Sequence, residues 1–205
     1  MWWRQGRDLP PLVTTDPVTE SATTAGILPN AQVLFGNGRV GSDMQAGGRV
    51  DVGVWCDPRQ CCGYGYRFFG LGQDSTRFDI TSLENPVLAI PFVDNTTNTN
   101  DALLVAYPGL RSGEIHVLGN SSIIGSDVYT RILLCRDCNC RIDFITGWNY
   151  TKINDEMQIR SRQTVTETGG NIPVGTVTDI VDGFQARNEF NGGILGLLWE
   201  RQCGC

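Results

Sequence analysis

Eight cysteines are the residues of this chain best suited to chemistry, because thiols form disulfides and bind zinc. They fall into three groups, beside two short turns and near residue 205: Cys56, Cys61 and Cys62; Cys135, Cys138 and Cys140; and Cys203 and Cys205. Disulfides between neighbouring turns are the favoured interpretation, and all eight are candidates whose pairing the sequence does not choose. The alternative is a zinc site that uses Cys135 and Cys138, which form a CxxC motif, together with a second pair of cysteines. The third interpretation is that the thiols are free and have no role. The favoured interpretation, disulfides, requires no metal.

The remaining reactive residue types form no catalytic pattern. His116 is the only histidine, and neither a nucleophile elbow nor a metalloprotease motif occurs. The carboxylates Asp127, Asp143, Asp155 and Glu156 are scattered, which is typical of solvated positions rather than of acid–base catalysis. We therefore expect a protein that is not an enzyme, with no catalytic residues and no cofactor.

Two alternating hairpins position the first two cysteine groups. Residues 141–150 alternate strictly, so that one face of a strand is apolar and rich in aromatic residues: Ile142, Phe144, Thr146, Trp148 and Tyr150. The other face is charged or small, and residues 127–134 repeat this pattern before the turn. Residues 48–56 and 62–71 form a second hairpin of the same type, with valines, tyrosines and Phe68 on one face.

Two environments produce such hairpins. In a soluble β-sandwich the apolar face covers a core, whereas in an outer-membrane barrel it contacts lipid and the polar face lines the lumen. Alternation alone does not separate them and by itself favours the sandwich. In a barrel, the charged faces give these lumen-lining candidates: Arg49, Asp51, Arg67, Asp127, Arg131, Arg141 and Asp143. Cross-strand salt bridges that support the fold are the favoured role for these charges.

Composition and charge limit the classes of partner that the chain is expected to bind. Charged residues make up 19% of the chain and the net charge is −6 without a basic cluster, so nucleic acid is not an expected partner. No segment approaches the roughly 18 apolar residues of a membrane helix. No export signal opens the sequence, although its cysteines suggest an oxidising compartment, so we expect the natural start to lie upstream.

The chain is expected to be all-β, an antiparallel meander of roughly 6–8 strands that forms part or whole of an outer-membrane-type β-barrel. Residues 1–30 are expected to be an extended lead-in and residues 31–205 the barrel domain, incomplete at its C-terminal end. Residues 73–122 and 151–189 are interpreted as long connections on one side of the sheet. Both short turns and all eight cysteines would then lie at the opposite, periplasmic rim.

Several segments carry a resemblance to a known family: WWRQGRDLPPLVTT, VLFGNGRV, GGRVDVGVW, PVLAIPF, RILLCRDCNCRIDFITGWNYTKINDEMQI and NEFNGGILGLLWE. They resemble the beta-barrel porin-7 family of planctomycete outer-membrane proteins over nearly the whole chain. The resemblance implies an outer-membrane location and a barrel architecture, names no catalytic residue, and shifts the preference from sandwich to barrel. Family members look longer, with a signal peptide and further strands.

The expected function is that of an outer-membrane β-barrel protein with a structural or pore and transport role in the cell envelope. Its partners would be the lipid bilayer and the small solutes that a lumen would conduct. The alternative is a secreted, disulfide-stabilised β-sandwich that acts as a binding or adhesion module. Polar strand faces and an aromatic patch on a loop would identify the sandwich, whereas aromatic residues spaced along strand faces would identify the barrel.

Overall fold

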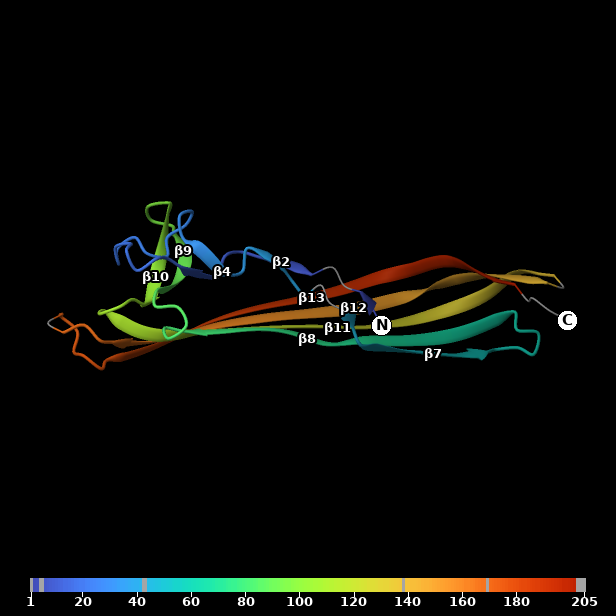
Figure 1. The fold of residues 1–205 in the computed structure, drawn as a ribbon. Coiled ribbons are helices and arrows are strands. Elements are labelled where there is room, and N and C mark those ends of the chain that lie inside the picture. Colours follow the sequence, from blue (N-terminus) through green and yellow to red (C-terminus); the bar gives the residue numbers. More distant parts are fainter. Residues whose placement is uncertain (1, 4–5, 42–43, 138, 169, 202–205) are drawn as a thin grey trace.

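The fold is all-β. The computed structural model describes residues 2–3, 6–41, 44–137, 139–168 and 170–201 (Figure 1). Over these residues the chain forms thirteen strands in four antiparallel sheets, and none of them is helical. The expectation of an all-β, antiparallel protein is confirmed.

Five long strands form the main sheet, which we call the long sheet. In the spatial order β13-β12-β11-β8-β7 it is a simple antiparallel meander. Its strands are β7 (Gly47–Trp55), β8 (Cys62–Thr81), β11 (Arg111–Arg136), β12 (Cys140–Val165) and β13 (Val177–Arg201). At about 3.3 Å per residue, the 26 residues of β11 extend for about 85 Å. The sheet is therefore much longer than a bilayer is thick.

The expected connections at residues 73–122 and 151–189 are wrong, because most of these residues lie within strands. β8 continues to Thr81, β11 begins at Arg111, and β12 continues to Val165. The register between β8 and β11 shifts between Ser121 and Ile123, so the inward-facing positions change parity along β8 and its alternation looks broken. The strand ends beyond this shift are mostly polar on their outer side, which makes them resemble loops in the sequence.

The meander also contains five strands rather than six to eight. The other strands form separate sheets, and in the described part of the chain the long sheet does not close, since β7 and β13 are its edges. A four-stranded sheet, here called the small sheet, has the order β10-β9-β3-β4: β3 (Val13–Thr15), β4 (Gln32–Phe35), β9 (Leu88–Asp94) and β10 (Thr99–Ala106).

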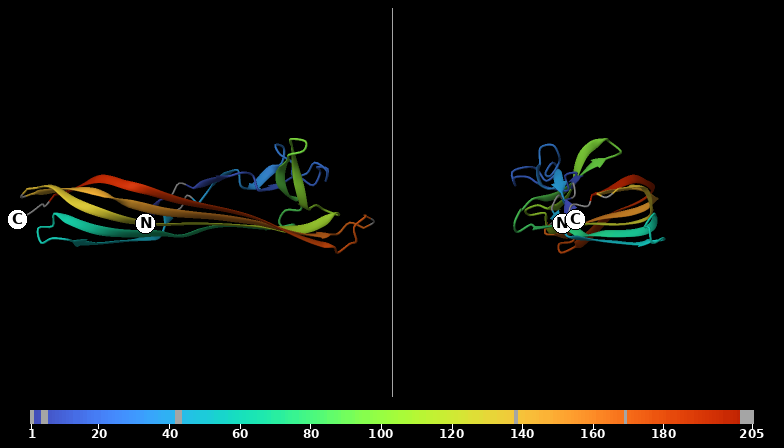
Figure 2. Two further views of the ribbon diagram at one scale, coloured as in Figure 1. Left: turned by 180° about the vertical axis from the view of Figure 1, so that it is seen from behind. Right: turned by 90° about the vertical axis from the view of Figure 1, so that its right-hand side faces the viewer.

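The N-terminal residues form structure of their own. Residues 1–30, expected as an extended lead-in, contribute three short strands, and β3 pairs with both β4 and β9. Two further pairs join β2 (Arg7–Leu9) to β5 (Gly38–Val40) and β1 (Trp2–Trp3) to β6 (Met44–Gln45). The long sheet is curved, and the small sheet lies on one side of it, near one end (Figure 2). The pairings of β1, β2 and β3 join residues that lie far apart in the sequence.

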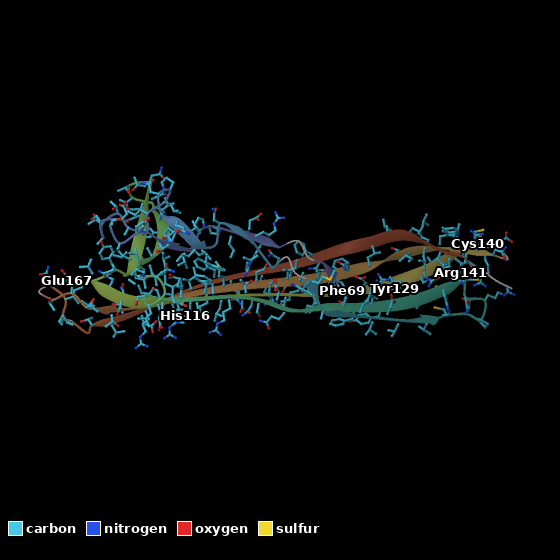
Figure 3. All side chains as sticks on the ribbon, viewed as in Figure 1. Phe69, His116, Tyr129, Cys140, Arg141 and Glu167 are labelled. Atoms are coloured by element: carbon cyan, nitrogen blue, oxygen red, sulfur yellow. The ribbon has the colours of Figure 1, made fainter. Side chains whose placement is uncertain are left out.

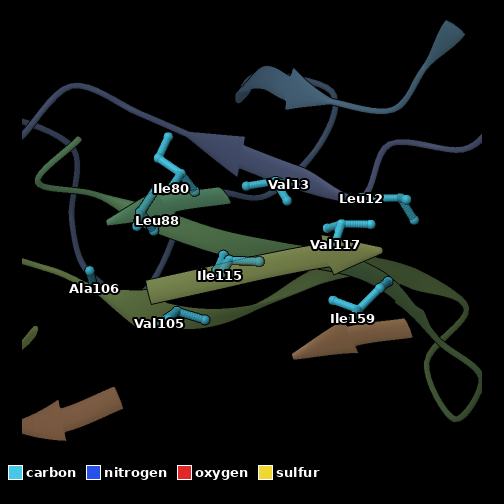
Figure 4. Packing of buried hydrophobic residues seen from close by; sticks show 9 residues of the cluster. All are labelled: Leu12, Val13, Ile80, Leu88, Val105, Ala106, Ile115, Val117 and Ile159. Atoms are coloured by element: carbon cyan, nitrogen blue, oxygen red, sulfur yellow. The ribbon is translucent and has the colours of Figure 1, made fainter. Parts of the chain in front are cut away.

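The core lies between the small sheet and that end of the long sheet (Figure 4). Ile115 and Val117 of β11 are buried there with Ile159 of β12, and they contact apolar residues of the N-terminal segment, β9 and β10. We call the side of the long sheet that carries these residues its inner face. Because β11 side chains alternate, Asp127 and Tyr129 project from the same inner face nearer the other end of the strand.

Candidate functional site

An apolar band covers the outer face of the long sheet at the end away from the small sheet. Its members are large apolar or aromatic side chains on all five strands: Val50, Val52, Val54, Tyr64, Tyr66, Phe68, Ile124, Val128, Ile132, Leu134, Ile142, Phe144, Trp148, Tyr150, Leu195, Leu197 and Trp199. Trp148 is 55% exposed and Trp199 64% exposed. From Ile142 to Tyr150 the band extends for about 27 Å along β12 at about 3.4 Å per residue.

The boundary of this band is sharp. After Tyr150, the outer positions of β12 are Lys152, Asn154 and Glu156, whose partners on β13 are Glu189, Arg187 and Gln185. Soluble monomers rarely expose an apolar surface that continues over five strands. A continuous apolar surface about 25 Å high is the pattern of a lipid-facing barrel surface.

The inner face behind the band is charged, and its first cluster centres on Asp51 of β7. Arg49 and Arg67 donate to its Oδ2 at 3.2 and 3.0 Å, and the Tyr129 hydroxyl donates to its Oδ1 at 2.7 Å. Arg67 also donates to Asp127 at 3.4 Å, so the cluster joins β7, β8 and β11. The guanidinium of Arg67 lies 5.5 Å from the centre of the Tyr129 ring.

A second cluster centres on Asp143 of β12, whose side chain is fully buried. Arg131 and Arg141 each donate from Nε to its Oδ2 at 2.9 Å, and Arg131 also reaches Glu200 of β13 at 3.0 Å. Both guanidinium groups lie over the ring of Trp55, at 4.9 and 4.4 Å from its centre. Trp55, Arg131, Arg141 and Glu200 line an open cavity of about 610 Å³ at the end of the sheet, whereas Asp143 is buried behind them.

Glycines make room for the aromatic side chains of the inner face. Tyr129 is opposite Gly65, and a Cβ atom on that glycine would lie 2.2 Å from the tyrosine ring. Trp55 covers Gly63 in the same way, and Phe69 covers its cross-strand partner on β11. Figure 3 shows Phe69 and Tyr129 on the part of the sheet behind the band. An aromatic ring over a glycine protects the exposed backbone and permits local curvature.

All seven residues predicted from the sequence to line a lumen lie on the inner face, and each forms at least one ion pair with another of the seven. Four further residues of the two clusters were not predicted from the sequence: Tyr129, Trp55, Asn149 and Glu200. Alternation could have placed Tyr129, Trp55 and Asn149 on this face, because they share the parity of Asp127, Asp51 and Asp143 on their own strands. The contacts of Asn149 and Glu200 are not local signals: Asn149 donates to Asp127 through a cross-strand pairing, and Glu200 depends on the register of β13.

The cysteines that are described gather at one end of the long sheet, beside the β7–β8 and β11–β12 turns (Figure 1). Cys56, Cys61, Cys62, Cys135 and Cys140 are present there as free thiols. The other three candidates, Cys138, Cys203 and Cys205, lie outside the described residues. Within the described segments, no group of three or more histidine, cysteine or acidic side chains is arranged to bind a metal ion. The same segments contain no helix that is long and apolar enough to cross a membrane.

Comparison with known proteins gives one family. The model of the family described as "Putative beta barrel porin-7" matches residues 1–205, the whole sequence. A search of curated proteins finds no match for the chain. The two-faced strands described above are those expected of such a family, and the resemblance noted in the sequence is confirmed. The chain belongs to the beta barrel porin-7 family.

Proposed function

We propose that this chain forms part of the wall of an outer-membrane β-barrel, with its apolar band in lipid and its inner face toward the lumen. The observation that carries this proposal is the separation of the two faces over the same stretch of five strands. The outer face is apolar for about 27 Å along β12, and charged side chains are confined to the inner face there. Bacterial barrels have short turns on the periplasmic side, so the end with the cysteines faces the periplasm.

The charges of the inner face serve mainly to support the wall. In the two clusters, four arginines (Arg49, Arg67, Arg131 and Arg141) are paired with four acids (Asp51, Asp127, Asp143 and Glu200), which leaves no net charge. A lumen that selects ions by charge would present an excess of one sign. We infer a structural role for this network, beside which small polar solutes pass without selection by charge.

The secreted β-sandwich is the competing candidate, because the small sheet does pack face to face on one end of the long sheet. That packing covers only the end away from the band. The aromatic side chains of the band are spaced along strand faces, which was the feature expected to identify the barrel. Neither arrangement suggests catalysis, and we propose no enzymatic role, no cofactor and no nucleic-acid partner for the chain.

Quenching by brominated lipid tests the proposal directly. Trp148 and Trp199 lie in the band, whereas Trp55 lies on the inner face under two arginines. The protein, expressed from its gene with the native upstream region and reconstituted in vesicles, should lose fluorescence when the acyl chains carry bromine. The double variant Trp148→Phe/Trp199→Phe should lose most of that quenching, and Trp55→Phe should retain it.

Equal quenching in both variants, or recovery of the protein in the soluble fraction of the cell, would reject the lipid-facing band. Migration on gels before and after boiling supplies an independent measurement, since a closed barrel migrates faster when it is not boiled. Glycan binding would then be the assay for the sandwich if the protein proved soluble.

A further inference from the structure

The turn between β7 and β8 places two cysteines opposite each other. Trp55 and Gly63 are the last paired residues of the two strands, and the amide of Cys56 donates to the carbonyl of Cys62 at 2.9 Å immediately beyond them. Directly opposed residues that share such a backbone hydrogen bond have Cα atoms about 5.5 Å apart, which lies within the range that a disulfide spans.

We propose that Cys56 and Cys62 form a cross-strand disulfide that closes the β7–β8 turn. The geometry distinguishes this pair from the other described thiols. Cys61 precedes Cys62, so its side chain points to the opposite face from that of Cys62. Its thiol contacts the carbonyl oxygen of Arg59 at 3.9 Å. Cys135 is paired with Ile142 and Cys140 with Arg201, so neither is opposite another cysteine.

Formation of the bond is an exchange with an external disulfide, such as that of a thiol oxidoreductase or of oxidised glutathione. The thiolate of one cysteine attacks a sulfur of that disulfide, and one thiolate of the oxidant leaves. The second cysteine then attacks the mixed disulfide, so that one S–S bond forms in the protein. The two thiols lose two protons and two electrons in total, and the oxidant is reduced to two thiols.

The bond would fix a turn on which the inner face depends. The carboxylate of Asp57 accepts hydrogen bonds from the amides of Cys61 and Cys62 at 2.8 and 3.1 Å, and these bonds, the Cys62 amide foremost, lower the pKa of Asp57. The carbonyl oxygen of Gln60 in the same turn accepts a hydrogen bond from Arg141 at 2.7 Å. The disulfide therefore holds in place an acceptor for an arginine of the Asp143 cluster.

A further arginine depends on the same turn. Arg136 of β11 donates to the carbonyl of Arg59 at 3.1 Å and to the side chain of Gln60 at 3.3 Å. Both acceptors lie between the two proposed disulfide partners. Closing the turn thus orders the rim where β7, β8, β11 and β12 meet.

Peptide mapping identifies the pair, because Arg59 lies between the two cysteines. The purified protein is equilibrated with oxidised glutathione, its free thiols are blocked with iodoacetamide, and it is digested with trypsin without reduction. Cleavage after Arg49, Arg59 and Arg67 separates peptide 50–59, with one cysteine, from peptide 60–67, with two. We expect the two peptides to be recovered as one linked species that reduction separates.

Two matched variants assign the bond within the second peptide. Cys61→Ser should retain the linked species, whereas Cys62→Ser should abolish it. Loss of the link in Cys61→Ser with retention in Cys62→Ser would overturn the proposal, as would recovery of Cys56 alkylated in the unsubstituted protein. The outcome does not depend on whether the band contacts lipid, so failure here leaves the proposed function to its own test.

Discussion

Asp143 holds the second cluster of the inner face together, because it is a fully buried carboxylate with an arginine on each side. Removal of one partner of a buried ion pair leaves the others without compensation and typically costs about 3–5 kcal/mol. Arg131 retains Glu200 at 3.0 Å, but Arg141 would lose its only acidic partner among the described residues. The network is therefore most sensitive at its buried acid.

We predict that Asp143→Ala lowers the free energy of unfolding by about 3 kcal/mol, measured by urea titration of the protein in lipid vesicles. Asp179→Ala is the matched control, since Asp179 of β13 forms an exposed ion pair with Arg160 of β12. Exposed pairs contribute about 0–1 kcal/mol, so this variant should differ little from the unsubstituted protein. Equal losses in the two variants would contradict the importance of burial.

Gly65 is needed for a different reason, since the ring of Tyr129 occupies the space where a side chain would begin. A Cβ atom at residue 65 would lie 2.2 Å from the ring, whereas at Gly70 of the same strand the nearest atom is 3.8 Å away. We predict that Gly65→Ala destabilises the protein by about 1–3 kcal/mol through overpacking. Gly70→Ala should be tolerated in the same urea titration; a loss as large as that of Gly65→Ala would show that the contact with Tyr129 is not the cause.

At the scale of elements, the strands are predictable from sequence where both faces are well marked. Along residues 141–150 every second side chain is apolar, so the pattern predicts a strand, its outer face and its charged inner face. The same reasoning failed at Asp74 to Thr81, where a register shift changes the parity of β8 and the outer side chains are polar. An alternating pattern appears where the two faces of a strand meet different environments. Beyond the band, the outer face of the strand ends meets water and the inner face meets water or the small sheet, so the pattern is weak there.

The position of the band along β11 gives a prediction for one element. Val128 lies near the middle of the band, opposite Tyr66 and Trp148, whereas Ser122 lies on the same outer face beyond it, opposite Asn154. An arginine at the bilayer midplane costs about 2–4 kcal/mol, and near the interface about 0–1 kcal/mol. Val128→Arg should therefore destabilise the protein in vesicles, lowering its free energy of unfolding by about 2–4 kcal/mol.

Ser122→Arg is the control on the same face of the same strand, and it should fold as the unsubstituted protein does. If the two arginine variants were equally stable, or if Val128→Arg were stable in detergent-free buffer, the band would not lie in lipid.

At the scale of the whole molecule, the inner face of the long sheet has two different halves. Behind the band it is charged and paired within itself, whereas at the other end it is apolar and covered by the small sheet. The second half could not be predicted from sequence, because β3 pairs with β4 and β9 across long separations and its burial depends on that assembly. Residues 1–30 look like a polar lead-in until Leu12 and Val13 are seen in the core.

The two halves should therefore respond separately to a substitution in the core. Val117 and Leu118 are neighbours on β11, but Val117 is buried under the small sheet and Leu118 is 41% exposed on the outer face.

Val117→Asp would place a charge without a partner in the core, so the small sheet should detach while the band remains anchored. Brief digestion of vesicles with trypsin should then cleave at Arg7 within β2 and at Arg39 within β5, while the part of β12 that carries the band stays protected. Leu118→Asp should keep the digestion pattern of the unsubstituted protein, because its side chain faces away from the core. Cleavage throughout the long sheet in Val117→Asp would show instead that the two halves fold as one cooperative unit.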